Sequence, residues 1–255
     1  MQSENLCLYN ARRKFAADGH CYEYIIFNRT VFNPDGLELA GDWGERVFAP
    51  SGDVGREANS ERGSEDDARR ARRRALRTLT DHVQANPDLD CFVTLTLDGD
   101  RVDRYDYQAI IRKYNAWLSN AVQRRGLKYV LVPEHHKDGA IHFHGLTNNV
   151  WRTTDSGLTS RSGGRILNIE NYKFGYSTLV RIDDNREAVC RYVTKYITKD
   201  ADKVGGRYIL AGGKLAKPHV EYDRVDITQF DGFTVQVTDG LCCKLVDCSK
   251  MSTGC

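Results

Sequence analysis

The segment 129–146 constrains the fold more strongly than any other part of the chain. Two runs of mostly apolar and β-branched residues, 129–132 and 141–146, flank the dipeptide Asp138-Gly139. Such runs favour strands, and Asp-Gly between them is a turn signal of β-hairpins. We therefore predict an antiparallel hairpin here.

Further elements are predicted around this hairpin. The runs 92–97 and 174–180 have the composition of strands. Apolar residues at helical spacing predict a helix over 106–125, which Gly126 should end, and another over about 185–199. Strands paired by hairpins, with helices beside them, predict an α+β fold with a central antiparallel sheet and flanking helices.

The flanks of this region carry weaker signals. A strand is predicted at 22–27, and weak strand signals occur at 207–210, 219–227 and 233–237. Ser64 is a suitable N-cap for a helix that runs to about residue 85. We expect an N-terminal arm with this helix at 1–87, the main domain at 88–225 and a tail at 226–255. The helix carries six arginines: Arg69, Arg70, Arg72, Arg73, Arg74 and Arg77. It could lie along a DNA backbone, or it could be an ordinary solvated helix.

Composition and charge narrow the class of protein. Hydrophobic residues make up 40% of the 255 residues, which is enough for a sizeable core. No apolar run reaches the roughly 18 residues that a membrane helix needs, and no signal peptide is evident, so we expect no membrane partner and a cytosolic location. The net charge is only +2, but residues 101–199 hold 17 Lys and Arg against 9 Asp and Glu. This excess suits a polyanionic partner, although a plain solvated surface is the alternative.

Eight cysteines are present, four of them in the last 14 residues, and none forms a CxxC pair. We expect reduced thiols, with a small metal knuckle in the tail as the alternative.

His142 and His144 are the first candidate site residues. Two positions apart on a strand, they project from one face of the sheet. They could bind a divalent metal or be a structural pair. The residue that joins them depends on the turn: a two-residue loop puts His135 opposite His142, whereas a three-residue loop or a bulge puts Glu134 there. A carboxylate would suit Mg²⁺ or Mn²⁺ better.

Two tyrosines and two lysines form the second candidate group. In a helix, Tyr192 and Tyr196 are neighbours on one face, and Lys195 and Lys199 lie alongside them. The tyrosines could simply be buried, but apolar residues at 189, 193 and 197 supply a core stripe without them. Nearby lysines would favour the charged form of a phenol, whose free pKa is about 10, and so activate it as a nucleophile.

Three segments together resemble the motifs of HUH-type rolling-circle replication initiators: 92–97, 134–144 and 192–199. Their order and spacing are similar to those of the two-tyrosine gene A replication proteins of small single-stranded DNA phages, and the Glu-to-His spacing also resembles geminivirus Rep proteins. The resemblance covers about residues 90–200. It implies the HUH endonuclease fold, which is ferredoxin- or RRM-like.

The resemblance also implies roles for individual residues. Glu134, rather than His135, would join His142 and His144 in holding one Mg²⁺ or Mn²⁺ ion. Tyr196 would be the first nucleophile and Tyr192 the terminating one. Lys195 and Lys199 would neutralise phosphate charge or lower the pKa of a tyrosine.

The implied function is a site-specific DNA endonuclease and strand transferase. Such an enzyme nicks and rejoins single-stranded or supercoiled origin DNA through a 5′-phosphotyrosine. The chain shows no phosphate-binding loop, since Gly212-Gly213-Lys214-Leu215 lacks the required pattern. A host helicase and polymerase are therefore expected partners, in the cytoplasm of a bacterial host. One alternative is a relaxase or a transposase with the same chemistry. In a relaxase the tyrosine motif would precede the histidines, whereas here it follows them. The other alternative is a non-catalytic DNA-binding protein.

Overall fold

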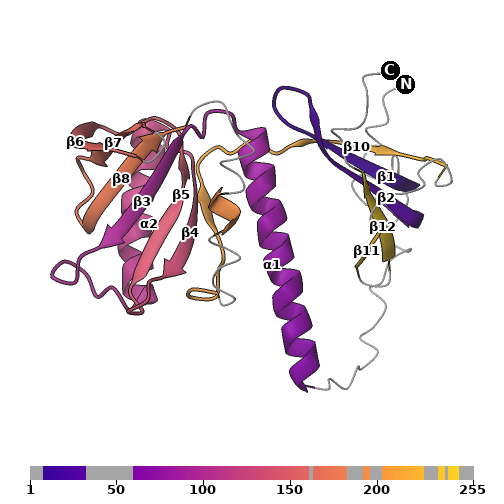
Figure 1. The fold of residues 1–255 in the computed structure, drawn as a ribbon, viewed down its shortest axis with the longest axis horizontal. Coiled ribbons are helices and arrows are strands. Elements are labelled where there is room, and N and C mark those ends of the chain that lie inside the picture. The colour runs from indigo at the N-terminus through magenta and orange to yellow at the C-terminus, as the bar shows by residue number, and fades with distance from the viewer. Residues whose placement is uncertain are drawn as a thin grey trace. The chain divides into compact units, whose positions relative to one another are not determined.

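The chain forms two compact units. The computed structural model describes residues 8–32, 60–160, 163–182, 192–195, 203–226, 235–238 and 241–246. One unit consists of residues 64–217, and the other combines residues 1–63 with 218–255 (Figure 1). These boundaries differ from those drawn from the sequence, because the basic helix belongs mainly to the larger unit and the two flanks of the chain share the smaller one.

A seven-stranded antiparallel sheet forms the larger unit. Its strand order is β6-β7-β8-β3-β5-β4-β9, and its helices lie on both faces, which confirms the predicted α+β class. The strands are β3 (Cys91–Leu97), β4 (Tyr129–His135), β5 (Ile141–Thr147), β6 (Thr153–Thr159), β7 (Arg165–Ile169), β8 (Gly175–Arg181) and β9 (Leu210–Gly212).

Helix α2 (Tyr107–Arg125) covers one face of this sheet. Its start is fixed by Asp106, whose side chain accepts hydrogen bonds from the backbone N–H groups of Gln108 and Ala109. Its end is fixed by Gly126, which takes the left-handed conformation at φ 67° that glycine adopts without strain. Both limits agree with the sequence prediction. The helix buries Ile110, Tyr114 and Leu118 against alternate residues of β3 and β5.

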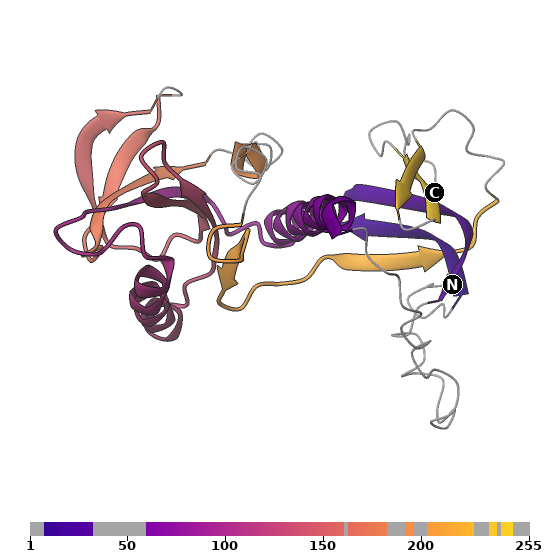
Figure 2. The same cartoon turned by 90° about the horizontal axis from the view of Figure 1, so that it is seen from below.

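A second apolar cluster lies on the opposite face. Leu79 and Val83 of helix α1 (Ser60–Ala85) are buried there together with Val130, Val132, Leu146 and Val193. Residues 192–195 are helical, and Figure 2 shows this short turn and α2 on opposite sides of the sheet. The rest of the helix predicted over 185–199 lies outside the described residues.

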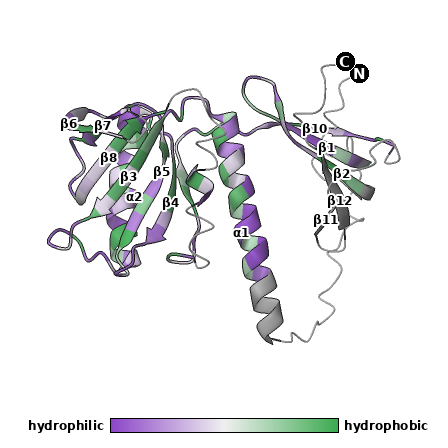
Figure 3. Ribbon diagram, in the orientation of Figure 1, coloured by the Kyte–Doolittle hydropathy of each residue, from purple (hydrophilic) through white to green (hydrophobic). Residues whose placement is uncertain are grey.

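The start predicted for α1 is wrong. The helix begins at Ser60, four residues before Ser64. A single glycine costs a helix only about 1 kcal/mol relative to alanine, so Gly63 does not stop it. Figure 3 shows that the middle of α1 is hydrophilic, where the arginines lie.

The smaller unit is a five-stranded antiparallel sheet of order β10-β1-β2-β12-β11. Its strands are β1 (Leu8–Phe15), β2 (Cys21–Phe32), β10 (His219–Asp223), β11 (Val235–Thr238) and β12 (Leu241–Val246). The strand predicted at 22–27 is confirmed within β2. Strand β1 was not predicted; it pairs with β10 through contacts such as Ala11 opposite Asp223.

Two further expectations can be compared with the described residues. Among the described residues, Cys91 is buried, Cys21 is half-buried, and neither forms a disulfide. In the parts of the chain that the structure describes, no helix is both long and apolar enough to cross a membrane.

Candidate active site

The alternation of residues along β3 and β5 divides the sheet into an apolar face and a polar face. Val93 and Leu95 of β3 are buried in the cluster under α2, whereas Thr94 and Thr96 project to the other side. On β5, Phe143 stacks against the ring of Tyr114 with centroids 4.6 Å apart. Its neighbours, the two candidate histidines, consequently share the face that carries the threonines.

The turn between β4 and β5 places Glu134 opposite His142. The backbone N–H of His136 donates to the carbonyl of Ala140, which leaves a three-residue loop, and Gly139 takes the left-handed conformation at φ 84°. His135 pairs with Ile141 instead and is exposed. Of the two alternatives that the sequence left open, the three-residue loop is therefore the one that forms.

A carboxylate and an imidazole are in direct contact in this site. The distance between His144 Nε2 and Glu134 Oε2 is 3.0 Å, and the Glu134 side chain is only 7% exposed. A buried carboxylate is costly unless it is paired or bound to a cation. Glu134 thus occupies a position where a positive partner stabilises it.

Two threonines of β3 lie beside the Nδ1 atoms of the two histidines. Thr94 Oγ1 lies 3.2 Å from His144 Nδ1, and Thr96 Oγ1 lies 3.4 Å from His142 Nδ1. A partner at Nδ1 fixes the ring and directs Nε2 toward a ligand. Sequence reasoning assigned these threonines no role; the signal for them was their two-residue spacing, which matches that of the histidines on the adjacent strand.

Burial and a neighbouring ring affect His142. Its ring stacks on that of His136, with centroids 5.0 Å apart. Partial burial lowers the pKa of His142, and the positive charge that His136 can carry lowers it further, whereas Glu134 opposes the change. A lowered pKa favours the neutral imidazole, which is the form that binds metals.

The donor set of this site suits a divalent cation, since it combines a buried carboxylate with two imidazoles held by second partners. Within the described residues, however, no three His, Cys, Asp or Glu side chains are arranged to hold a metal ion. Glu134 and His144 touch and His142 lies across from Glu134, but the convergence of all three on one point, which we predicted, is absent there.

The tyrosine segment reaches this face through Phe92. The ring of Tyr192 meets the ring of Phe92 edge-on at 5.1 Å, and Phe92 lies parallel to the ring of His144 at 6.3 Å. Tyr192 is 48% exposed, while Val193 beside it is fully buried. Val193 therefore anchors the segment, as the predicted core stripe requires, and Tyr192 remains accessible.

The structure brings together only part of the second candidate group. Lys195 is exposed on the same helical turn as Tyr192. Tyr196 and Lys199 lie outside the described residues, so their positions relative to Glu134 stay predictions.

Comparisons with known proteins concern this region. Residues 90–201 match a family model of replication-associated proteins, the ORF2 family. The "Phasyl DNA replicon protein arp" of Escherichia coli is 29% identical over 124 residues, which is 42% of this chain and 42% of that protein. The chain thus spans less than half the length of this relative. No solved structure matches it significantly. The segment that carries Glu134, His142, His144 and Tyr192 is accordingly similar to the replication-associated proteins of the ORF2 family.

Proposed function

We propose that this protein initiates rolling-circle replication by nicking and rejoining single-stranded DNA at an origin. The observation that carries the proposal is the polar face of the larger sheet. Glu134 touches His144 and lies opposite His142, and an accessible tyrosine reaches the same face through Phe92. The match of residues 90–201 to replication-associated proteins supports DNA as the substrate.

Glu134, His142 and His144 would hold one Mg²⁺ or Mn²⁺ ion. When bound, such an ion polarises the scissile phosphate and neutralises part of its charge. The protein's own contribution is to fix the two imidazoles through Thr94 and Thr96 and to keep the carboxylate buried. Ion binding would require His142 to move toward the other two ligands, because the three side chains do not converge in the described part of the structure.

The cut is a transesterification. The phenolic oxygen of a tyrosine attacks the phosphorus, and the bond from phosphorus to the 3′ oxygen breaks. The tyrosine gives up its proton and the departing 3′ oxygen acquires one, which leaves a 5′-phosphotyrosine and a free 3′-OH. Rejoining is the reverse step: a 3′-OH attacks the phosphotyrosine and releases the phenol.

Two tyrosines would permit a complete round of replication. Tyr196 would make the first cut and carry the DNA, and Tyr192 would make the second. Lys195 and Lys199 would offset phosphate charge near the attacking oxygen. The free 3′-OH would serve a host polymerase, and a host helicase would open the duplex.

The test is the formation of a covalent protein–DNA adduct. The full chain is incubated with labelled single-stranded oligonucleotides of random sequence and Mn²⁺, and the adduct is sought on a denaturing gel. We expect an adduct with Mn²⁺, none with EDTA and none for the double variant Tyr192→Phe/Tyr196→Phe. An adduct from the double variant at the wild-type yield would contradict the tyrosine mechanism.

A further inference from the structure

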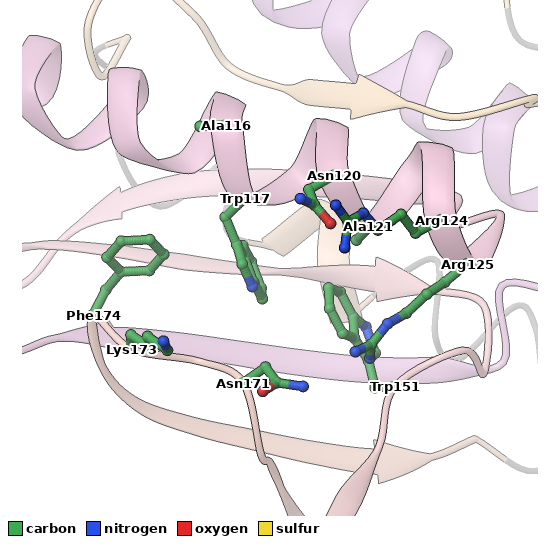
Figure 4. Close-up of a pocket in the computed structure, with 10 residues that line it drawn as sticks. All are labelled: Ala116, Trp117, Asn120, Ala121, Arg124, Arg125, Trp151, Asn171, Lys173 and Phe174. Atoms are coloured by element: carbon green, nitrogen blue, oxygen red, sulfur yellow. The ribbon is translucent and has the colours of Figure 1, made fainter.

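A hollow of about 520 Å³ lies on the α2 side of the larger sheet, on the face away from Glu134 and the histidines. Side chains from α2, from the loop before β6 and from the loop before β8 converge on it (Figure 4). Its size falls within the range of about 300–1,000 Å³ that is typical of ligand sites. The proposed function uses none of its residues.

Aromatic rings form a rigid wall of this hollow. The rings of Trp117 and Trp151 stack at 4.8 Å with an angle of 14°, and Phe174 meets Trp117 edge-on at 6.0 Å. Trp151 is buried, and its Nε1 donates to Thr147 Oγ1 at 3.2 Å. Trp117 and Phe174 are only half-buried. They therefore present fixed aromatic surface to the hollow.

The charge of the hollow is positive. Arg124, Arg125 and Lys173 line it, and no acidic residue does. None of these three cations makes an ion pair within the described part of the chain. Their charges are thus available to an anionic ligand.

Two exposed amides, Asn120 and Asn171, also line the hollow. Each offers a hydrogen-bond donor and an acceptor, the complement of a base edge. Aromatic faces beside arginines and lysines are the combination that binds single-stranded nucleic acid, because bases stack on the rings and phosphates meet the cations.

We propose that this hollow binds a nucleotide of single-stranded DNA, away from the strand position that is cut. The base would lie against Trp117 or Phe174, and the phosphates would meet Arg124, Arg125 and Lys173. Single-stranded DNA is favoured over duplex because a base must leave its stack to reach a recessed ring. The inference rests on the proposed DNA substrate but not on the tyrosine chemistry.

The test measures binding without cutting. The full chain is titrated with oligothymidylate in EDTA, and affinity is followed by anisotropy of a label on the oligonucleotide. In the double variant Arg124→Gln/Arg125→Gln we expect affinity to fall about tenfold at moderate salt, with a shallower dependence on salt. The matched control, Arg112→Gln/Lys113→Gln, removes two exposed charges from α2 outside the hollow and should change affinity less than about twofold.

Tryptophan fluorescence tests stacking independently. The chain contains three tryptophans, and Trp43→Phe leaves only the two in the hollow. We expect oligothymidylate to quench their emission in this background and in the control variant. Trp117→Phe, which keeps an aromatic ring in the core, should retain its melting temperature and lose most of the quenching.

Two results would overturn the inference: an equal loss of affinity in the arginine variant and its control, or unchanged tryptophan emission at saturating oligonucleotide. Adduct formation in Mn²⁺ is scored separately. Quenching without an adduct would refute the nicking mechanism and leave the hollow as a DNA site. An adduct without quenching would refute the DNA site in the hollow and leave the nicking mechanism intact.

Discussion

Thr94 and Thr96 connect the histidines to the strand at the centre of the site. Each hydroxyl lies beside the Nδ1 atom of one histidine. Replacing either threonine with valine keeps the shape and removes the hydroxyl. We expect Mn²⁺ affinity, measured by isothermal titration, to fall about 10- to 100-fold, as for other partners of metal-binding histidines.

Thr178 provides the control for this experiment. It lies opposite Thr94 on β8, on the same face of the sheet. Thr178→Val should leave Mn²⁺ affinity unchanged. Stability should fall by no more than about 0.5–1.5 kcal/mol in any of the three variants, the net value of one hydrogen bond. If both Thr94→Val and Thr96→Val bind Mn²⁺ with wild-type affinity, the threonines do not position the histidines for metal binding.

The two tyrosines should differ in their kinetics. Tyr196→Phe removes the proposed first nucleophile while keeping the ring, so the first cut should drop to background on the adduct gel. Tyr192→Phe should still cut once but fail in transferring the strand to a second oligonucleotide. The reverse pattern would exchange the two roles without changing the chemistry.

The residues of this site were predictable to different degrees. Period-two alternation was enough to put His142 and His144 on one face. It could not choose between Glu134 and His135, because one additional loop residue shifts the register of the entire strand, and Asp138-Gly139 is compatible with a two-residue and a three-residue loop. The aromatic contact between Tyr192 and Phe92 could not be predicted from the sequence, because 100 residues separate them along the chain.

At the scale of elements, α1 has an apolar face and a basic face. Ala71, Ala75 and Leu76 pack toward the sheet, while Arg69, Arg73 and Arg74 are exposed. Replacing these three arginines with glutamine should weaken DNA binding and reduce the slope of log affinity against log salt by about 2, since each phosphate contact with single-stranded DNA contributes about 0.7. Binding isotherms at several salt concentrations measure this slope.

A control with the same charge change uses exposed cations on other elements of the larger unit, Arg112, Lys113 and Arg165. It should alter the slope far less. If both triple variants behave alike, α1 serves only as a solvated packing element.

Strands with strong local signals were predictable, and those stabilised by distant partners were not. The runs at 92–97, 129–132 and 141–146 are rich in apolar and β-branched residues, and each forms a strand. β6 escaped prediction because it is mostly exposed, polar and interrupted by Gly157 in the left-handed conformation. β1 pairs with its neighbour β2 in a hairpin and, on its other side, with β10, about 200 residues later, and no local pattern reveals the second pairing.

At the scale of the whole molecule, the larger unit should depend on α1. Leu79 and Val83 of that helix are buried against the sheet. We expect a fragment of residues 64–217 to unfold cooperatively in urea, and a fragment of residues 88–217 to be much less stable. In the full chain, Leu79→Ala should cost about 2–5 kcal/mol of unfolding free energy, as for other buried leucines.

Leu127→Ala serves as the comparison for Leu79→Ala, because Leu127 is also a fully buried leucine but belongs to the cluster on the α2 side of the sheet. Circular dichroism followed through the urea titration measures the stability of each fragment and variant. A fragment starting at residue 88 that matches the stability of 64–217 would show that α1 is dispensable for this unit.

The pairing of β1 and β2 with β10 and β12 has a consequence for synthesis on the ribosome. The hairpin of β1 and β2 emerges first, but its outer neighbours are translated about 190 to 220 residues later. At elongation rates of about 5–20 residues per second, both edges of the nascent hairpin stay unpaired for roughly 10–40 seconds. The unit encoded between them can fold during that interval. The larger unit can therefore be complete before the smaller sheet, and the unpaired edges of the hairpin are where a chaperone would act.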